Sequence, residues 1–173
     1  MVAIGEIGLD YYRDLSPRKI QQTAFRRQLE LAVDLKMPVV IHTRDAFEDT
    51  MNIITGYAKD LPCVKKYKVK EDTASAYRVF DIDGIISAGG IITYKNSRMS
   101  KVAEEVPIEK VILETDAPYL TPVPFRGKTN QPAYVKYVYE KMAELKEMTF
   151  TEVEKIVDRT ALKFYRLIET FGD

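Results

Sequence analysis

Three apolar segments of the chain carry ionisable side chains at or near their ends. Glu6 lies within AIGEIGL, His42 ends PVVIH, and Glu114 and Asp116 end VILETD. A buried carboxylate is costly unless it is paired or bound to a metal. Two carboxylates and an imidazole are suitable ligands for a divalent cation. The three segments therefore predict a metal site built from Glu6, His42 and Asp116.

Each of these residues also has an ordinary structural interpretation. His42 alone would be a core histidine with satisfied hydrogen bonds, and Glu6 alone would pair with Arg13 or Arg44. The coincidence of three such strand ends favours a site, because the carboxyl ends of parallel strands meet on one face of a sheet or barrel. Glu114 and Asp116 are two residues apart and are expected on the same side of their strand.

The loop from Phe125 to Asn130 has the composition of an anion-binding site. Arg126 and Lys128 supply positive charge, and Asn130 is expected to cap a helix that begins near Pro132, whose N-terminus would favour an anion. An exposed loop with an ordinary helix cap explains the same residues.

A run of lysines between residues 65 and 70 offers a second place for an anion. Tyr67 lies within this run. The lysines would either contact a nucleic-acid backbone, with Tyr67 stacking on a base, or form a solvated edge.

The elements that position these residues alternate along the chain. Continuous apolar runs at residues 2–10, 38–42 and 84–94 and from residue 111 are typical of strands buried on both faces. A weaker strand is expected between Leu61 and Lys70. Helical patterns separate the strands, which predicts an α/β fold with a parallel sheet of about five strands and flanking helices.

The first helix is expected to begin at Ser16 and Pro17, with its apolar residues at helical spacing. These residues are Ile20, Ala24, Leu31 and Leu35. A second helix is expected over 44–57, with Phe47, Met51 and Ile54 on one face.

Two further helices are expected in the C-terminal third. One runs from about residue 132 to residue 146. The last begins at a capping box formed by Thr149 and Glu152. Its apolar face is expected to contain Val153, Ile156, Val157, Phe164, Leu167 and Phe171.

Composition limits the class of protein. The 173 residues are 46% hydrophobic and 30% charged, which predicts a single domain over 1–173 and excludes disorder. Lys plus Arg and Asp plus Glu each number 26, so there is no general basic field for adsorption to nucleic acid or membranes. The single cysteine, Cys63, and the lack of a signal or transmembrane pattern indicate a cytoplasmic protein.

Four segments in order resemble the signatures of the TatD family of metal-dependent deoxyribonucleases: VAIGEIGLDYYRDLSP, PVVIHTRDA, VILETDAPYLTPVP and RGKTNQPAYVKYV. The resemblance covers nearly the whole chain. It implies a TIM-type (β/α)8 barrel that hydrolyses phosphodiester bonds of DNA with two divalent ions. Glu6 would bridge the metals, His42 would be a ligand, and Asp116 would be a ligand that also activates water. The phosphate-binding residues would be Arg44, Arg126, Lys128 and Asn130.

The chain departs from the family pattern at several metal ligands. A strand bearing a His-x-His pair and two more strand-helix units would precede GEIGLD, which here begins at residue 5. Another histidine is expected after Val64, where lysines stand, and Gln131 replaces a usual Glu. A lysine there would repel a second ion. One site for Mg2+ or Mn2+, with Zn2+ as an alternative, is therefore expected, or Lys66 would replace the second cation.

Five strands cannot close an eight-stranded barrel, so an incomplete, truncated barrel with open edges is expected. A homodimer is the preferred way to cover these edges. Repacked termini or a partner carrying the missing units are the alternatives.

The leading functional hypothesis is a metal-dependent hydrolase of the TatD deoxyribonuclease type, with DNA as its substrate, weakened or inactive in this chain. A catalytically silent scaffold or nucleic-acid-binding domain is the first alternative. A hydrolase of small phosphate esters is the second.

Overall fold

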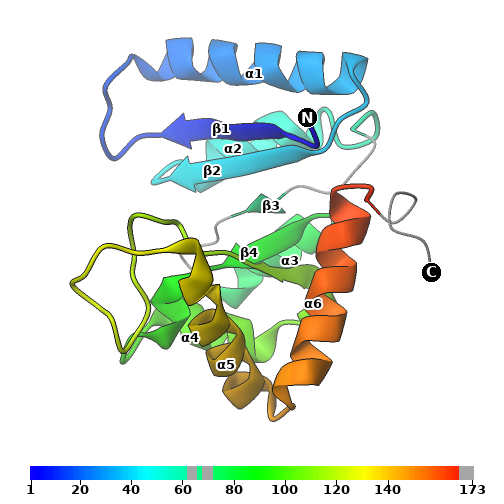
Figure 1. The fold of residues 1–173 in the computed structure, drawn as a ribbon. Coiled ribbons are helices and arrows are strands. Elements are labelled where there is room, and N and C mark those ends of the chain that lie inside the picture. The colour runs from blue at the N-terminus through cyan, green and yellow to red at the C-terminus, as the bar shows by residue number, and fades with distance from the viewer. Residues whose placement is uncertain (62–65, 68–71, 168–173) are drawn as a thin grey trace.

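The computed structural model describes residues 1–61, 66–67 and 72–167. Five parallel strands form one sheet in the order β1-β2-β3-β4-β5, and helices separate them along the chain (Figure 1). This confirms the expected parallel α/β arrangement. The strands are β1 (Ile4–Asp10), β2 (Val39–Arg44), β3 (Lys66–Tyr67), β4 (Ile85–Ala88) and β5 (Val111–Leu113).

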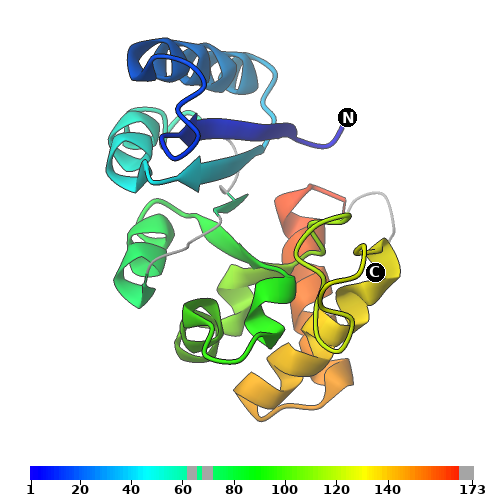
Figure 2. The same ribbon diagram turned by 90° about the vertical axis from the view of Figure 1, so that its left-hand side faces the viewer.

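Helices flank the strands on the outside of the sheet. Helix α1 packs on β1 and α2 on β2, while α3 packs on β4 and α6 on β5. Figure 2 shows β3 between the pair β1–β2 and the pair β4–β5. The helices are α1 (Arg18–Asp34), α2 (Phe47–Thr55), α3 (Thr73–Phe80), α4 (Arg98–Glu105), α5 (Val135–Lys146) and α6 (Phe150–Phe164), with 3₁₀ turns η1 (Gly90–Thr93), η2 (Ile108–Lys110) and η3 (Pro132–Tyr134).

The first two strands approach each other closely at a glycine. Gly8 pairs with His42 in the register of β1 and β2. The φ of Gly8 is 144°, and a Cβ atom there would lie 2.0 Å from the carbonyl oxygen of His42. Only glycine fits such a position. The close approach brings β1, which carries Glu6, against the strand that carries His42.

The core lies between the strands and the helices that cover them. Every residue of β4 is buried, as expected for a continuous apolar strand. Phe25 of α1, Ile41 of β2, Ile54 of α2 and Val157 of α6 are almost completely buried in the same core.

The predicted apolar face of the first helix is wrong. Ile20 and Leu31 are 60% and 49% exposed, whereas Phe25, Leu29 and Ala32 are fully buried against the core. The helix has two apolar stripes, and the one that contains Phe25 packs against the strands. The predicted helix start is also shifted, because Pro17 occupies the N-cap and no side chain caps the helix.

One strand prediction needs correction. The segment 84–94 is a strand only as far as Ala88, and Gly90–Thr93 forms a 3₁₀ turn. A Cβ atom at Gly90 would lie 2.0 Å from the carbonyl oxygen of Leu120, so the chain turns here beneath a later loop. The weak strand expected between Leu61 and Lys70 is present as β3, Lys66–Tyr67, whereas residues 62–65 and 68–70 lie outside the described residues.

The helices after β2 are close to expectation. Phe47, Met51 and Ile54 are buried on α2, and the capping box of Thr149 and Glu152 is confirmed. Helix α6 ends at Phe164, so Leu167 lies beyond the helix, and Phe171 lies outside the described residues. Within the described chain, no helix combines the length and apolar character needed to cross a membrane.

Candidate metal and phosphate site

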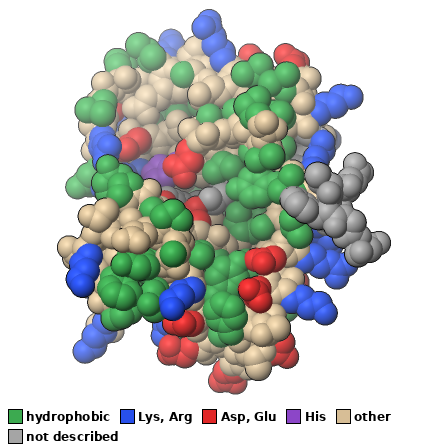
Figure 3. Space-filling view, in the orientation of Figure 1, with side chains coloured by type: hydrophobic (Ala, Val, Ile, Leu, Met, Phe, Trp, Pro, Cys, Tyr) green, Lys and Arg blue, Asp and Glu red, His purple; other side chains and the backbone are tan. Residues whose placement is uncertain are grey.

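A cavity of about 920 Å³ lies at the carboxyl ends of the strands. Its walls combine acidic and basic side chains with the only histidine. Figure 3 shows this histidine beside acidic side chains in a hollow below the part of the molecule formed by β1, β2, α1 and α2 in Figure 1. The acidic, basic and imidazole groups of the walls are Glu6, Asp10, Glu114, Asp116, His42, Arg13, Arg44, Lys95, Arg98 and Arg126.

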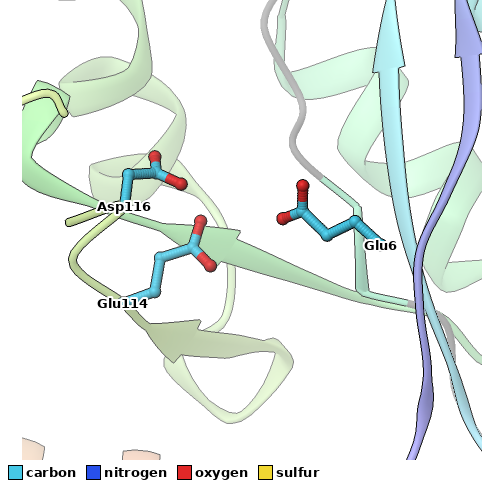
Figure 4. A group of neighbouring side chains, drawn as sticks. All are labelled: Glu6, Glu114 and Asp116. Atoms are coloured by element: carbon cyan, nitrogen blue, oxygen red, sulfur yellow. The ribbon is translucent and has the colours of Figure 1, made fainter. Parts of the chain in front are cut away.

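Three carboxylates from opposite sides of the cavity converge. One oxygen each of Glu6, Glu114 and Asp116 lies within 4.8 Å of the others. Glu6 extends from β1 toward the two acids that follow β5 (Figure 4). Like charges this close repel each other, and a cation bound among them would relieve the repulsion. A donor set of carboxylate oxygens suits a hard divalent ion such as Mg2+ or Mn2+.

His42 lies at the edge of this group. Its Nδ1 is 3.7 Å from Oε2 of Glu6, and its side chain is about one third exposed. The structure thus brings Glu6 together with His42 and, separately, with Asp116. Within the part of the chain that is described, the close group consists of carboxylates and does not include His42.

Glu114 is the residue that sequence reasoning left out of the ligand set. The signal was present, because Glu114 ends the same VILETD segment as Asp116. Its backbone N–H donates to the carbonyl oxygen of Ala88 at 3.0 Å, which extends the pairing of β4 and β5 by one residue. Its Oε1 accepts a 2.9 Å hydrogen bond from Ser87, a buried hydroxyl of β4.

Asp116 reaches the cavity through a turn rather than through strand alternation. Strand β5 ends at Leu113, and the φ of Asp116 is 55°, in the left-handed region. The expectation that Glu114 and Asp116 share one side of a strand is therefore wrong in its geometry, although both side chains enter the cavity. An added Cβ atom at Gly89 would lie 3.4 Å from Cγ of Glu114 and 3.5 Å from Oδ2 of Asp116, so this glycine lies directly against both acids.

Asp10 forms the wall at the end of β1. Burial raises the pKa of its carboxyl, but hydrogen bonds from the N–H groups of Arg13 and Tyr12, together with the charges of Arg44 and Arg13, hold the pKa below its usual value. The hydrogen bonds measure 2.9 Å from Arg13 and 3.0 Å from Tyr12. Asp10 therefore stays ionised and fixes the loop that follows β1.

Two guanidinium groups line the cavity and rest on aromatic rings. Arg44 lies 3.7 Å from the ring centroid of Tyr12, and Arg126 lies 4.3 Å from that of Tyr94. Such cation–π contacts hold the charges in place without neutralising them. Both arginines were predicted as phosphate-binding residues, and their position beside the carboxylate cluster suits that role.

The other two predicted phosphate-binding residues lie differently. Lys128 is outside the set of residues that line the cavity, with its Nζ 5.5 Å from the ring centroid of Phe125. Asn130 is buried, and the prediction that it caps a helix is wrong. Its amide donates to the carbonyl oxygens of Thr115 and Tyr119, the latter at 2.6 Å, and so ties the loop 115–119 to the segment just before η3.

The predicted lysine run lies almost entirely outside the described residues. Lys65, Lys68 and Lys70 lie outside the described residues, as does the side chain of Lys66. The suggestion that Lys66 replaces a second cation stays a prediction.

Parallel strands with acidic groups gathered at their carboxyl ends define a TIM-barrel-like α/β protein with a candidate metal centre. The chain belongs to the TatD related DNase family, whose model matches residues 1–166.

Relatives and solved structures agree with this assignment. The chain is 42% identical to the uncharacterized metal-dependent hydrolase YabD of Bacillus subtilis, covering 96% of this chain and 66% of that protein. It is 39% identical to the uncharacterized metal-dependent hydrolase YcfH of Escherichia coli K12, covering 96% and 62%. The crystal structure of YjjV, a TatD homologue from Escherichia coli, matches with a TM-score of 0.88 at 27% identity, covering 95% and 63%. The chain thus spans less than two thirds of the length of these proteins.

Proposed function

We propose that the cavity hydrolyses phosphodiester bonds of DNA with one divalent ion, Mg2+ or Mn2+, with Zn2+ as an alternative. The convergence of Glu6, Glu114 and Asp116 within 4.8 Å carries this proposal. The arginines at the same cavity, Arg44 and Arg126, support phosphate as the group that is bound, because a guanidinium matches the geometry of phosphate oxygens.

The chain's own residues have distinct roles in this reaction. Glu6, Glu114 and Asp116 hold the ion, which when bound supplies Lewis-acid activation of the phosphate and of water. Asp116 and Glu6 are the catalytic residues, with Asp116 accepting the proton of the attacking water. Arg44 and Arg126 bind the phosphate oxygens and hold the phosphorus in line with the incoming oxygen. The bond from phosphorus to the leaving sugar oxygen then breaks, that oxygen takes up a proton from solvent water, and Asp116 releases its proton to solvent.

The proposal extends to the architecture. The five strands are part of a TIM-type barrel, incomplete in this chain, with β1 and β5 at the edges of the sheet formed by the described residues. Self-association as a homodimer would cover these edges. Light scattering after gel filtration tests this, and a clean monomer would contradict it. A cytoplasmic location is supported by the single cysteine.

Hydrolysis of a single-stranded oligonucleotide tests the activity. Wild-type protein should cleave it in Mn2+ or Mg2+ and not in EDTA. Asp116→Asn should lower the rate at least about 100-fold, because it removes the negative charge that attracts the ion and the carboxylate that accepts the proton. Asp34→Asn is the matched control, since Asp34 lies at the end of α1 and does not line the cavity, and its rate should be unchanged.

Two other outcomes would replace the proposal. Cleavage of bis(p-nitrophenyl) phosphate without cleavage of DNA would identify a hydrolase of small phosphate esters. Binding of DNA that survives both EDTA and Asp116→Asn, without cleavage of either substrate, would identify a silent nucleic-acid-binding domain.

A further inference from the structure

Tyr119 combines a place in the cavity wall with unusual exposure. It lines the cavity three residues after Asp116, and 74% of its surface remains accessible. Exposed apolar side chains are common one at a time. Tyr119, however, belongs to a group, since Leu120 and Val123 of the same loop are 40% and 44% exposed.

The backbone of Tyr119 is held on both sides. Its N–H donates to the carbonyl oxygen of Asp116 at 2.8 Å, and its carbonyl oxygen accepts a 2.6 Å hydrogen bond from the amide of Asn130. The next residue, Leu120, packs its carbonyl onto Gly90, where no side chain would fit. The backbone of Tyr119 is therefore fixed relative to Asp116, which is a proposed metal ligand. Because this backbone is already ordered, binding a ligand to the ring costs less conformational entropy.

The other aromatic rings near the cavity already have ring or cation partners. Arg44 covers Tyr12 and Arg126 covers Tyr94, while Tyr134 stacks with Phe125 at a centroid distance of 4.6 Å. None of the ring contacts within the described part of the chain involves Tyr119. Its ring is thus available to a ligand that also reaches the carboxylates.

A phosphodiester held at the acidic cluster carries a sugar and a flat nucleobase beside it. An exposed aromatic ring binds a base by stacking, with little dependence on which base it is. Arg126, which lines the same cavity, supplies positive charge for the neighbouring phosphate. A phosphate ester without a nucleobase makes the arginine contact but not the stacking contact.

We propose that Tyr119 is a specificity-determining residue that stacks on the nucleobase next to the phosphodiester at the carboxylate cluster. This inference rests on the proposed function, because it assumes that the cavity binds a nucleic-acid strand. It assigns to Tyr119 the selection of nucleotides over phosphate esters that lack a base.

Equilibrium binding tests the proposal separately from turnover. Fluorescence anisotropy is measured in Ca2+ with a labelled single-stranded pentadeoxynucleotide and with an abasic oligomer of the same length, and electrophoresis checks that both stay intact. Wild-type protein should bind the pentadeoxynucleotide about tenfold more tightly than the abasic oligomer, as expected for one stacked base. Tyr119→Ala should remove this preference, and Tyr119→Phe, which keeps a stacking ring, should restore it.

Tyr77→Ala is the matched control, since Tyr77 is 47% exposed on α3 and does not line the cavity. It should bind both oligomers as wild type does. Equal loss of binding to both oligomers in Tyr119→Ala, an unchanged preference in that variant, or no preference in wild type would overturn the inference. If the protein does not hydrolyse DNA but shows a base preference that depends on Tyr119, only the proposed function is overturned. If the protein hydrolyses DNA but shows no such preference, only this inference is overturned.

Discussion

The hydroxyl of Ser87 on β4 donates a 2.9 Å hydrogen bond to Oε1 of Glu114, which follows β5. Ser87 is only 3% exposed and pairs with Ile112 in the register of the two strands. The sheet itself therefore orients one of the three converging carboxylates. A carboxylate held in this way needs little reorganisation when it binds a cation.

Ser87→Ala should weaken the binding of Mn2+ about tenfold or more, because loss of a partner that orients a metal ligand typically has this effect. Isothermal titration calorimetry measures the dissociation constant. Ser75→Ala, which changes a buried serine on α3, serves as the control. Equal metal affinity in Ser87→Ala and wild type would show that Glu114 does not depend on this hydrogen bond.

Metal binding should stabilise the folded protein. At a concentration of Mn2+ one hundred times the dissociation constant, the gain is about 2.7 kcal/mol, or a rise in Tm of about 5 to 10 °C. Asp116→Ala and Glu114→Gln should each remove most of this shift, because the first removes one of the three converging carboxylates and the second replaces one with a neutral amide. Differential scanning calorimetry with and without EDTA checks this. If Glu114→Gln shows the same metal-induced rise in Tm as wild type, the ligands would instead be Glu6, His42 and Asp116.

Asp10 should contribute to stability at neutral pH. Its folded-state pKa is lowered, so the contribution is complete above the unfolded-state pKa of about 3.9 and is lost as the pH falls through the folded value. Asp10→Asn keeps an oxygen acceptor but loses the attraction of Arg44 and Arg13. The variant should melt at a lower temperature than wild type at pH 7, and the difference should shrink below about pH 4. A constant difference across this range would contradict the assignment.

The two apolar stripes of α1 should differ sharply in their effect on stability. Leu29→Ala should lower the free energy of unfolding by about 2–5 kcal/mol, because Leu29 is fully buried. Leu31→Ala should cost less than about 1 kcal/mol, because the side chain of Leu31 is exposed. Urea denaturation of the two variants provides the comparison. Similar losses would mean that the exposed stripe is covered in solution, as a self-associated form would require.

The sequence alone predicted the class of fold and most of the candidate site. Continuous β-branched runs separated by helical patterns indicate parallel strands, because strands buried on both faces carry such runs. The cost of burying charge then pointed to Glu6, His42 and Asp116, although Glu6 lies inside β1 and its side chain is 47% exposed. The capping box at Thr149 was equally readable, since it depends on residues within one turn of each other. Each of these signals is local in the chain.

Only the tertiary structure decided how distant segments meet. The sequence contains two apolar stripes on α1, and packing against β1 selects the one with Phe25. Asn130 is of a residue type that often caps helices, yet its amide donates to the carbonyl oxygen of Tyr119 in the loop that follows β5. Glu114 lies in the carboxylate cluster and accepts a hydrogen bond from Ser87 of β4, 27 residues earlier in the chain. These arrangements depend on contacts between residues far apart in the sequence. A local sequence pattern carries no information about the strength of such contacts.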